Sequence, residues 1–187
     1  TQDNLSLSKL LIFDFFVPDV LYQKKAADIL SQYDELFELN MRRIELLEDF
    51  AQDIYSKWFV HLQHAGHQST KIIKTPRGPT PEGWIWKKVK DISVFEKGKK
   101  PKKVYQNGKE GTIPHILIEV LRGGEAAYTD DLSVTAEKDD TIMVMDGASS
   151  GDVYIGYEGR DRSTLGDYKS LDKESVSPYL LYHFFKA

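Results

Sequence analysis

The chain has 187 residues, enough for one domain or two small ones, and its 41% hydrophobic content is typical of a folded globular protein. The absence of cysteine excludes both a disulfide framework and thiolate catalysis. No apolar stretch reaches the ~18 residues of a membrane span, and no secretory signal is recognisable, so we expect a cytoplasmic protein.

The formal net charge of −4 conceals a local concentration of positive charge. Nine lysines stand between Trp84 and Lys109, opposed only by Asp91 and Glu96. A mildly acidic chain with one basic segment indicates a local site for a polyanion and not a wholly basic surface.

Residues 1–17 end in the apolar run LLIFDFFV, which predicts a buried strand. Residues 18–66 then predict one long helix. Pro18 and Asp19 suit a first helical turn, good helix formers fill the interior, and Gly66 is a plausible cap. The stretch from Tyr22 to Gln63 is about 42 residues, or ~63 Å of helix at a rise of ~1.5 Å per residue.

A seam of side chains recurs along this helix with three- and four-residue spacing, interrupted by one extra four-residue step. The seam residues are Ala26, Ile29, Tyr33, Leu36, Asn40, Ile44, Leu47, Ala51, Ile54 and Trp58. Four aromatic residues widen the stripe: Phe37, Phe50, Tyr55 and Phe59. No other segment is long enough to cover this stripe, so we expect a partner helix from another chain, with the polar Asn40 favouring one register. The alternative is an ordinary bundle helix inside one domain.

Residues 67–83 are rich in proline and glycine and are expected to form a linker. Residues 84–187 then change to short strands, which we expect at 113–121, 133–136, 141–146 and 152–157. Near the start of this domain we expect four inward-facing residues: Trp86, Val89, Ile92 and Val94. Asn107-Gly108 signals a tight turn, and Pro178 opens a short apolar helix. The predicted fold class is α+β, a long coiled-coil-forming helix joined to a strand-rich domain.

Particular runs of residues carry a family resemblance. In the helix they are Gln23-Lys24-Lys25-Ala26, residues 34–48 and residues 55–60. In the strand-rich part they are Pro81-Glu82-Gly83-Trp84, Lys97-Gly98-Lys99, Ile113-Pro114, Asp146-Gly147-Ala148 with Ser150-Gly151, and Ser163-Thr164-Leu165. In these runs and their order, nearly the whole chain resembles the specificity subunits of type I restriction–modification systems.

The resemblance implies a non-catalytic DNA-binding protein. Residues 84–187 would be a target recognition domain that reads one half of a bipartite site on double-stranded DNA. The long helix would pair antiparallel with another helix and set the distance between two such domains. Methylation and cleavage, with the S-adenosylmethionine and ATP they use, would belong to separate modification and restriction subunits. The chain itself is expected to hold no cofactor.

The chain departs from the family pattern, because a full member has two recognition domains and two long helices. We therefore expect a dimer, formed with a second copy or a related chain, that reads a palindromic split site. Residues 1–17 would either complete an upstream domain or pack back on the recognition domain of this chain. We expect the second, because the apolar strand would otherwise be exposed.

Candidate DNA contacts fall into three groups. Lysines suited to phosphates are Lys97, Lys99, Lys100, Lys102 and Lys103. Arginines suited to guanine edges or phosphates are Arg122, Arg160 and Arg162, and hydroxyl donors in a small-residue turn are Ser149 and Ser150. The alternatives are a solvated lysine loop, surface ion pairs of the arginines, and a plain hairpin connection at the serines.

Catalytic motifs are weak throughout. His61, His64 and His67 lack a further metal ligand nearby, so we expect no metal site. Ser177-Pro178-Tyr179 lacks one proline of the adenine methyltransferase motif and has no glycine-rich cofactor loop with it. Two other functions stay open: a coiled-coil assembly protein that does not bind DNA, and a small metal-dependent nuclease.

Overall fold

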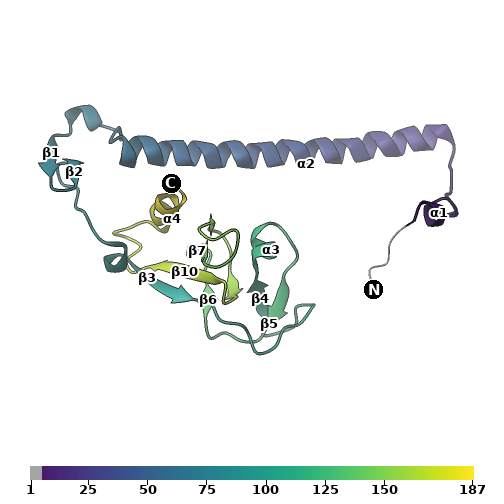
Figure 1. The fold of residues 1–187 in the computed structure, drawn as a ribbon. Coiled ribbons are helices and arrows are strands. Elements are labelled where there is room, and N and C mark those ends of the chain that lie inside the picture. The colour runs from purple at the N-terminus through teal and green to yellow at the C-terminus, as the bar shows by residue number, and fades with distance from the viewer. Residues whose placement is uncertain (1–5) are drawn as a thin grey trace. The chain divides into compact units, whose positions relative to one another are not determined.

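The computed structural model of the protein describes residues 6–187 and divides after residue 49 into two units, which are described in turn (Figure 1). No helix within residues 6–187 combines the length and the hydrophobicity needed to span a membrane. The helices are α1 (Leu7–Leu10), α2 (Val20–Tyr55), α3 (Ile118–Leu121) and α4 (Pro178–Lys186). The strands are β1 (Ile72–Thr75), β2 (Gly78–Pro81), β3 (Ser93–Lys97), β4 (Ile113–Ile116), β5 (Ala127–Thr129), β6 (Thr135–Ala136), β7 (Thr141–Val144), β8 (Val153–Tyr154), β9 (Gly159–Asp161) and β10 (Leu165–Ser170).

The strand expected in residues 10–17 is not formed. The backbone N–H of Leu11 bonds the carbonyl of Leu7 at 3.1 Å and ends α1, and Phe13 bonds Leu10 in a turn. Residues 14–19 then run without strand or helix and with exposed side chains. A strand requires a neighbour for its backbone groups, and the ladders among residues 6–187 include none for this stretch. Its packing on the C-terminal domain stays a prediction, and residues 1–5 of that predicted segment lie outside the described residues.

Helix α2 begins at Val20, two residues later than expected, because Asp19 serves as its cap. The Asp19 carboxylate accepts the backbone N–H of Leu21 at 2.8 Å, and its carbonyl accepts that of Gln23 at 3.0 Å. The helix is unbroken for 36 residues, about 54 Å. The large apolar side chains along the predicted seam are exposed.

The helix ends differently from the prediction. Residues Ser56–Val60 form a π-helical turn, in which the N–H of His61 reaches back to the carbonyl of Ser56 at 2.9 Å. Leu62 then takes a left-handed conformation with φ +57°, which does not continue the helix. Gly66 is also left-handed, but it precedes a short 3₁₀ turn and does not cap the helix.

The expected linker contains a β-hairpin. Strands β1 and β2 pair antiparallel, with Ile73 opposite Thr80. The Thr80 hydroxyl accepts the indole N–H of Trp86 at 2.9 Å, and the Arg77 guanidinium lies 5.7 Å from the Trp86 ring centre. Trp86 is therefore tied to the hairpin with an exposed ring, and its predicted inward position is wrong.

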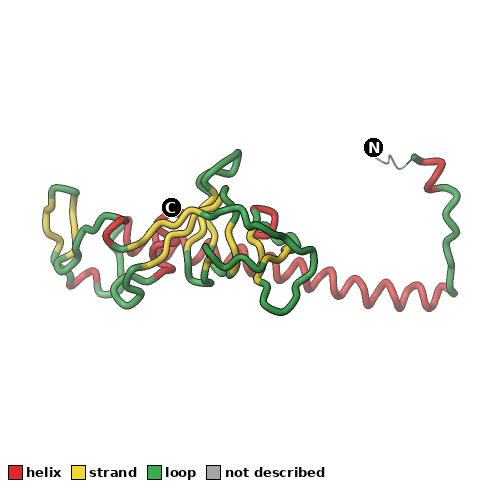
Figure 2. The backbone as a smooth tube through the Cα atoms, turned by 90° about the horizontal axis from the view of Figure 1, so that it is seen from below, coloured by secondary structure: helices red, strands yellow, loops and turns green. Residues whose placement is uncertain are grey.

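The C-terminal unit is built on two four-stranded sheets (Figure 2). The first has the order β3-β10-β7-β8 and is antiparallel throughout. The second has the order β5-β4-β9-β6, in which β4 and β9 run parallel. Residues from both sheets and from α3 form one core: Ile116, Leu121, Ala136, Ile142, Val144 and Leu165.

Several local predictions in this unit need correction. Residues 113–121 form β4 followed by α3, and β9 and β10 were not predicted. The turn expected at Asn107-Gly108 lies at Glu110-Gly111, where Gly111 has φ +76° and Thr112 bonds back to Lys109. Val94 is exposed, and Ser93 beside it is buried. The helix opened by Pro178 is confirmed as α4.

A row of stacked aromatic rings joins the end of α2 to the rest of this unit. Phe59 lies 5.4 Å from Tyr55 and 5.5 Å from Trp84, measured between ring centres. Trp84 also contacts His64, and Tyr55 contacts His183 of α4. Tyr55 and Phe59 were expected to widen the apolar stripe of the helix, but they pack against their own domain.

Candidate nucleic-acid interface

Three loops of the C-terminal unit meet where strands of the first sheet end, at a place that we call the loop edge. The register pairs Lys97 with Gly166, and Leu165 with Val144. This brings the end of β3, the start of β10 and the end of β7 to the same edge. The loops that leave this edge are residues 98–112, 145–152 and 162–164. These loops contain all the predicted DNA contacts except Lys97, Arg122 and Arg160. Lys97 and Arg122 lie beside the loops.

The first loop holds the predicted phosphate contacts and is fixed along its length. We call residues 97–103 the lysine loop. The Gly98 N–H donates to the Leu165 carbonyl at 3.0 Å, and a Cβ at Gly98 would lie only 2.3 Å from the Arg162 carbonyl oxygen. Pro101 is buried, and the Lys103 carbonyl accepts the Thr129 hydroxyl at 2.7 Å. The backbone is therefore anchored while its lysine side chains are exposed.

Most lysines of this loop are not neutralised by the protein. Lys97 lies 3.7 Å from the Asp146 carboxylate. Within residues 6–187, the other four have no carboxylate within ion-pair distance: Lys99, Lys100, Lys102 and Lys103. Four exposed ammonium groups on an anchored backbone are suited to a polyanion.

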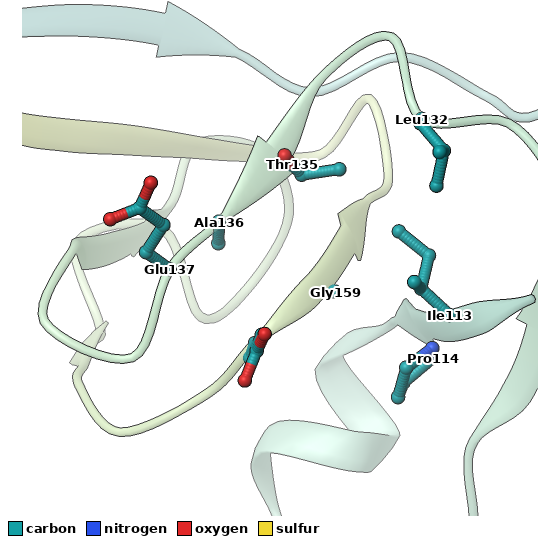
Figure 3. Close-up of a pocket in the computed structure, with 8 residues that line it drawn as sticks. Ile113, Pro114, Leu132, Thr135, Ala136, Glu137 and Gly159 are labelled. Atoms are coloured by element: carbon teal, nitrogen blue, oxygen red, sulfur yellow. The ribbon is translucent and has the colours of Figure 1, made fainter.

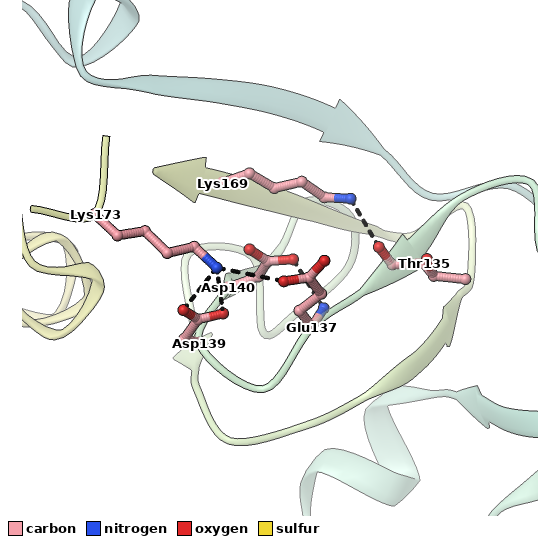
Figure 4. Close-up of polar contacts among 6 residues, drawn as sticks. All are labelled: Thr135, Glu137, Asp139, Asp140, Lys169 and Lys173. Atoms are coloured by element: carbon pink, nitrogen blue, oxygen red, sulfur yellow. Dashed lines mark hydrogen bonds and ion pairs between the residues drawn. The ribbon is translucent and has the colours of Figure 1, made fainter. Parts of the chain in front are cut away.

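At the opposite ends of these strands the loops carry acidic side chains. There the loop before β7 brings together Glu137, Asp139 and Asp140 (Figure 4). Lys173 lies 2.8 Å from the Asp139 carboxylate and 3.3 Å from that of Glu137, and Lys169 donates to the Thr135 carbonyl at 2.7 Å. Lys169 and Lys173 are bonded to other groups of the protein. They are therefore less available to a phosphate than the exposed lysines of the lysine loop.

Arg122 joins the loop edge from α3. Its guanidinium donates to the Ser149 hydroxyl at 2.5 Å and lies 3.4 Å from the Asp152 carboxylate. Hydrogen bonds to Tyr154 and Asp152 raise the pKa of Arg122. About half of the Arg122 side chain is exposed, so its remaining N–H groups can reach a ligand in a fixed orientation.

The two serines are partly committed to the protein. The Ser150 hydroxyl donates to the Met145 carbonyl at 3.1 Å, while the Ser149 hydroxyl accepts from Arg122. The turn that carries them begins and ends with left-handed glycines, Gly147 and Gly151. Ser149 and Ser150 therefore shape this turn, and Ser149 holds Arg122.

The two remaining arginines have opposite environments. Arg162 is exposed just beyond the end of β9. Arg160 is only 1% exposed, donates to the Val134 carbonyl at 2.7 Å and lies 3.6 Å from the Asp131 carboxylate. A buried, bonded guanidinium cannot reach DNA, so the prediction that Arg160 contacts DNA is wrong.

Three polar residues with roles at this edge were missed by the sequence reasoning. Thr129 anchors the lysine loop, Asp131 pairs with Arg160, and Asp152 holds Arg122. Asp131 accepts the Ser133 N–H at 3.1 Å, as aspartates in turns commonly do. The local sequence is typical of that role but gives no sign of the ion pair with a residue 29 positions later.

A hollow in the second sheet is a poor site for nucleic acid. It has a volume of about 580 Å³ and a largely apolar floor that includes Ile113, Pro114 and Leu132 (Figure 3). Its charged lining residues are Glu137 and Glu158, whose carboxylates would repel a phosphate backbone. Within residues 6–187, no group of three or more histidine or carboxylate side chains is placed to hold a metal ion.

The sequence of the chain is similar to those of known proteins over part of its length, although no protein-family model matches it. The type I restriction enzyme MjaVIII specificity subunit of Methanocaldococcus jannaschii is 28% identical over 105 residues, 54% of this chain and 25% of that relative. The MjaIX specificity subunit of the same organism is 27% identical over 112 residues, 58% of this chain and 25% of that relative. The chain thus spans about a quarter of the curated relatives it matches.

The fold agrees with this similarity. The crystal structure of a type I restriction–modification system S subunit from M. genitalium matches with a TM-score of 0.59 and 19% identity, covering 98% of this chain and 46% of that chain. The predicted α+β class, a long helix with a strand-rich domain, is confirmed. The resemblance to type I specificity subunits is confirmed as well.

Proposed function

We propose that this chain is part or half of a type I restriction–modification specificity subunit and recognises double-stranded DNA without catalysing a reaction. The observation that carries the proposal is the loop edge of the C-terminal unit. There Lys99, Lys100, Lys102 and Lys103 have no carboxylate partner in the described part of the chain, and Arg122 and Arg162 extend from neighbouring segments. Lysines supply affinity for phosphates, and arginines supply contacts to base edges.

The long helix has a separate role in this proposal. Its exposed apolar seam pairs with the same seam of a second copy or of a related chain, so that two recognition domains are held a fixed distance apart. Ile29, Leu36, Ile44 and Leu47 supply the apolar contacts, and Asn40 fixes the register. Two identical domains would read a palindromic split site.

The remaining parts of the proposal concern partners and location. Modification subunits and a restriction subunit bind the paired helices and carry out methylation and cleavage with their own cofactors. Residues 10–17 expose several apolar side chains, and we infer that they are covered by the recognition domain of the assembled protein. The assembly works where DNA is found, in the cytoplasm.

Salt dependence of DNA binding tests the proposal. The full chain is titrated with a fluorescent duplex of ~30 base pairs at several NaCl concentrations between about 50 and 200 mM. We expect the logarithm of the binding constant to fall linearly with the logarithm of salt concentration, since each phosphate contact releases counterions. A chain that does not bind the duplex at 50 mM salt would contradict the proposal.

A further inference from the structure

A buried ion pair lies behind the lysine loop, on the side away from solvent. Arg160 extends from β9, and its guanidinium lies 3.6 Å from the carboxylate of Asp131. The same guanidinium donates to the Val134 carbonyl at 2.7 Å. The Arg160 side chain is 1% exposed and that of Asp131 is 16% exposed, so water does little to screen the pair.

Hydrogen bonds connect this pair to the loop. The backbone N–H of Asp131 donates to the Thr129 hydroxyl at 3.1 Å, and that hydroxyl donates to the Lys103 carbonyl at 2.7 Å. Hydrogen bonds from the Ser133 hydroxyl and N–H lower the pKa of the Asp131 carboxylate most, and the Arg160 charge and the Lys102 N–H lower it further. Lys102 and Lys103, two of the exposed lysines, thus have backbones tied to Thr129 and Asp131.

The other end of the loop is fixed independently. The N–H of Gly98 bonds the Leu165 carbonyl, and Tyr105, just beyond the loop, exchanges backbone hydrogen bonds of 2.8 Å with Tyr128. Among the described residues, the Thr129 hydroxyl and the Asp131 carboxylate supply the side-chain bonds to the backbone between these two ends. They decide whether Lys99, Lys100, Lys102 and Lys103 are presented in one arrangement.

Stability alone is a weak explanation for such a pair. Removing an arginine and an aspartate from water is costly, and well-packed apolar residues of similar volume often stabilise a fold as well or better. An ion pair also imposes directions, because the guanidinium holds the carboxylate and its backbone in one orientation. The ion pair can therefore keep the lysine loop ordered, which apolar packing would not do.

We propose that Arg160, Asp131 and Thr129 are positioning residues that hold the lysine loop in its DNA-contacting arrangement without touching DNA. This rests on the proposed function, since it assigns the loop to DNA phosphates. Phosphate contacts made by a preordered loop do not incur the entropy loss of ordering it on binding. Loss of the anchors should therefore weaken binding to all duplexes alike while the lysines remain.

The test compares Thr129→Val with Thr141→Val. Both threonines are fully buried, but among residues 6–187 the Thr141 hydroxyl has no hydrogen-bond partner, and Thr141 pairs with Tyr168 at the other end of β10 from the loop. Amide hydrogen exchange of residues 99–103 is measured without DNA, and affinity for one duplex is measured at fixed salt. We expect Thr129→Val to speed exchange in the loop at least tenfold and to weaken binding about three- to tenfold. We expect Thr141→Val to leave loop exchange unchanged.

A double variant, Arg160→Met with Asp131→Leu, tests the ion pair itself. We expect it to keep the urea midpoint near that of the wild type, to exchange rapidly in residues 99–103 and to bind DNA weakly. Unchanged loop exchange in Thr129→Val, or a loosened loop with unchanged DNA affinity, would overturn this proposal alone. A wild-type chain that binds no duplex would instead overturn the proposed function, while the exchange data would still report on the anchors.

Discussion

The carboxyl groups of Asp161 and Asp167 are neighbours in the interior of the C-terminal unit, and neither side chain is exposed. Asp161 ends β9 in one sheet, and Asp167 lies on β10 in the other. Burial raises the pKa of both groups, and burial together with the neighbouring Asp167 raises the pKa of Asp161 to about 9. We therefore expect this buried pair to hold a proton at neutral pH.

This protonation predicts how stability depends on pH. Between the ordinary pKa of an aspartate and about 9, the folded protein keeps a proton on Asp161 that the unfolded chain releases. The contribution of Asp161 is therefore complete at low pH and is lost as pH rises, by up to about 1.4 kcal/mol per pH unit. We expect Asp161→Asn to remove this slope from urea unfolding measured between pH 6 and 8. His115 titrates in both proteins and cancels in the comparison. Equal slopes would show that Asp161 is not protonated.

The lysine loop is tested by charge removal. Replacing Lys99, Lys100, Lys102 and Lys103 with alanine should weaken binding to every duplex and lower the salt slope by up to about 3.6, since each phosphate contact contributes ~0.9. The control replaces Lys138 and Lys173, which already lie near carboxylates, and should change the slope little. An unchanged slope in the quadruple variant would remove the loop from the phosphates.

The exposed arginines should affect sequence preference. Arg122→Ala or Arg162→Ala should relax the choice at particular base pairs by about 1–3 kcal/mol while affinity for other sequences falls less. The measurement is competition between a selected duplex and single-base variants of it. A uniform loss across all variants would assign these arginines to phosphates.

Pairing of the long helix can be tested at two adjacent leucines. Leu47 lies on the seam, whereas Leu46 lies about 100° away around the helix, and both are exposed in the single chain. We expect Leu47→Glu to give a monomer and Leu46→Glu to remain a dimer by light scattering at micromolar concentration. Dimers in both variants would place the interface elsewhere.

The aromatic row should contribute measurably to stability. Trp84 packs against Phe59 and His64, whereas Trp86 is largely exposed beside its hairpin. We expect Trp84→Ala to lower the free energy of unfolding by about 2–3 kcal/mol and Trp86→Ala by about 1 kcal/mol or less. Urea denaturation measures both, and equal losses would argue against a structural role for the row.

The elements predicted well were those with a strong local pattern. Helix α2 has an uninterrupted run of helix formers with regular spacing, and α4 has proline in its first turn. Strands β9 and β10 were missed because their buried residues are polar or charged, such as Arg160, Asp161 and Asp167. Residues 113–121 are apolar throughout, so periodicity could not separate β4 from α3.

For a similar reason, the sequence predicted the loops of the candidate site but not which of their side chains are buried. The residue types and the lysine cluster mark the loops, but burial depends on where a strand ends. Arg160 and Arg162 would share one face if β9 continued, since side chains alternate along a strand. The strand stops at Asp161, so Arg160 enters the core and Arg162 reaches the surface. No local pattern fixes that end, because it depends on pairing with β4 and β6.

We propose that two recognition domains, spaced by paired helices, read two copies of one half-site. Selection of bound duplexes from a random pool tests it most directly, with the full chain at low salt. We expect enrichment of two identical half-sites in inverted orientation, separated by a spacer of constant length. Enrichment of a single uninterrupted site, or no enrichment over the starting pool, would contradict it.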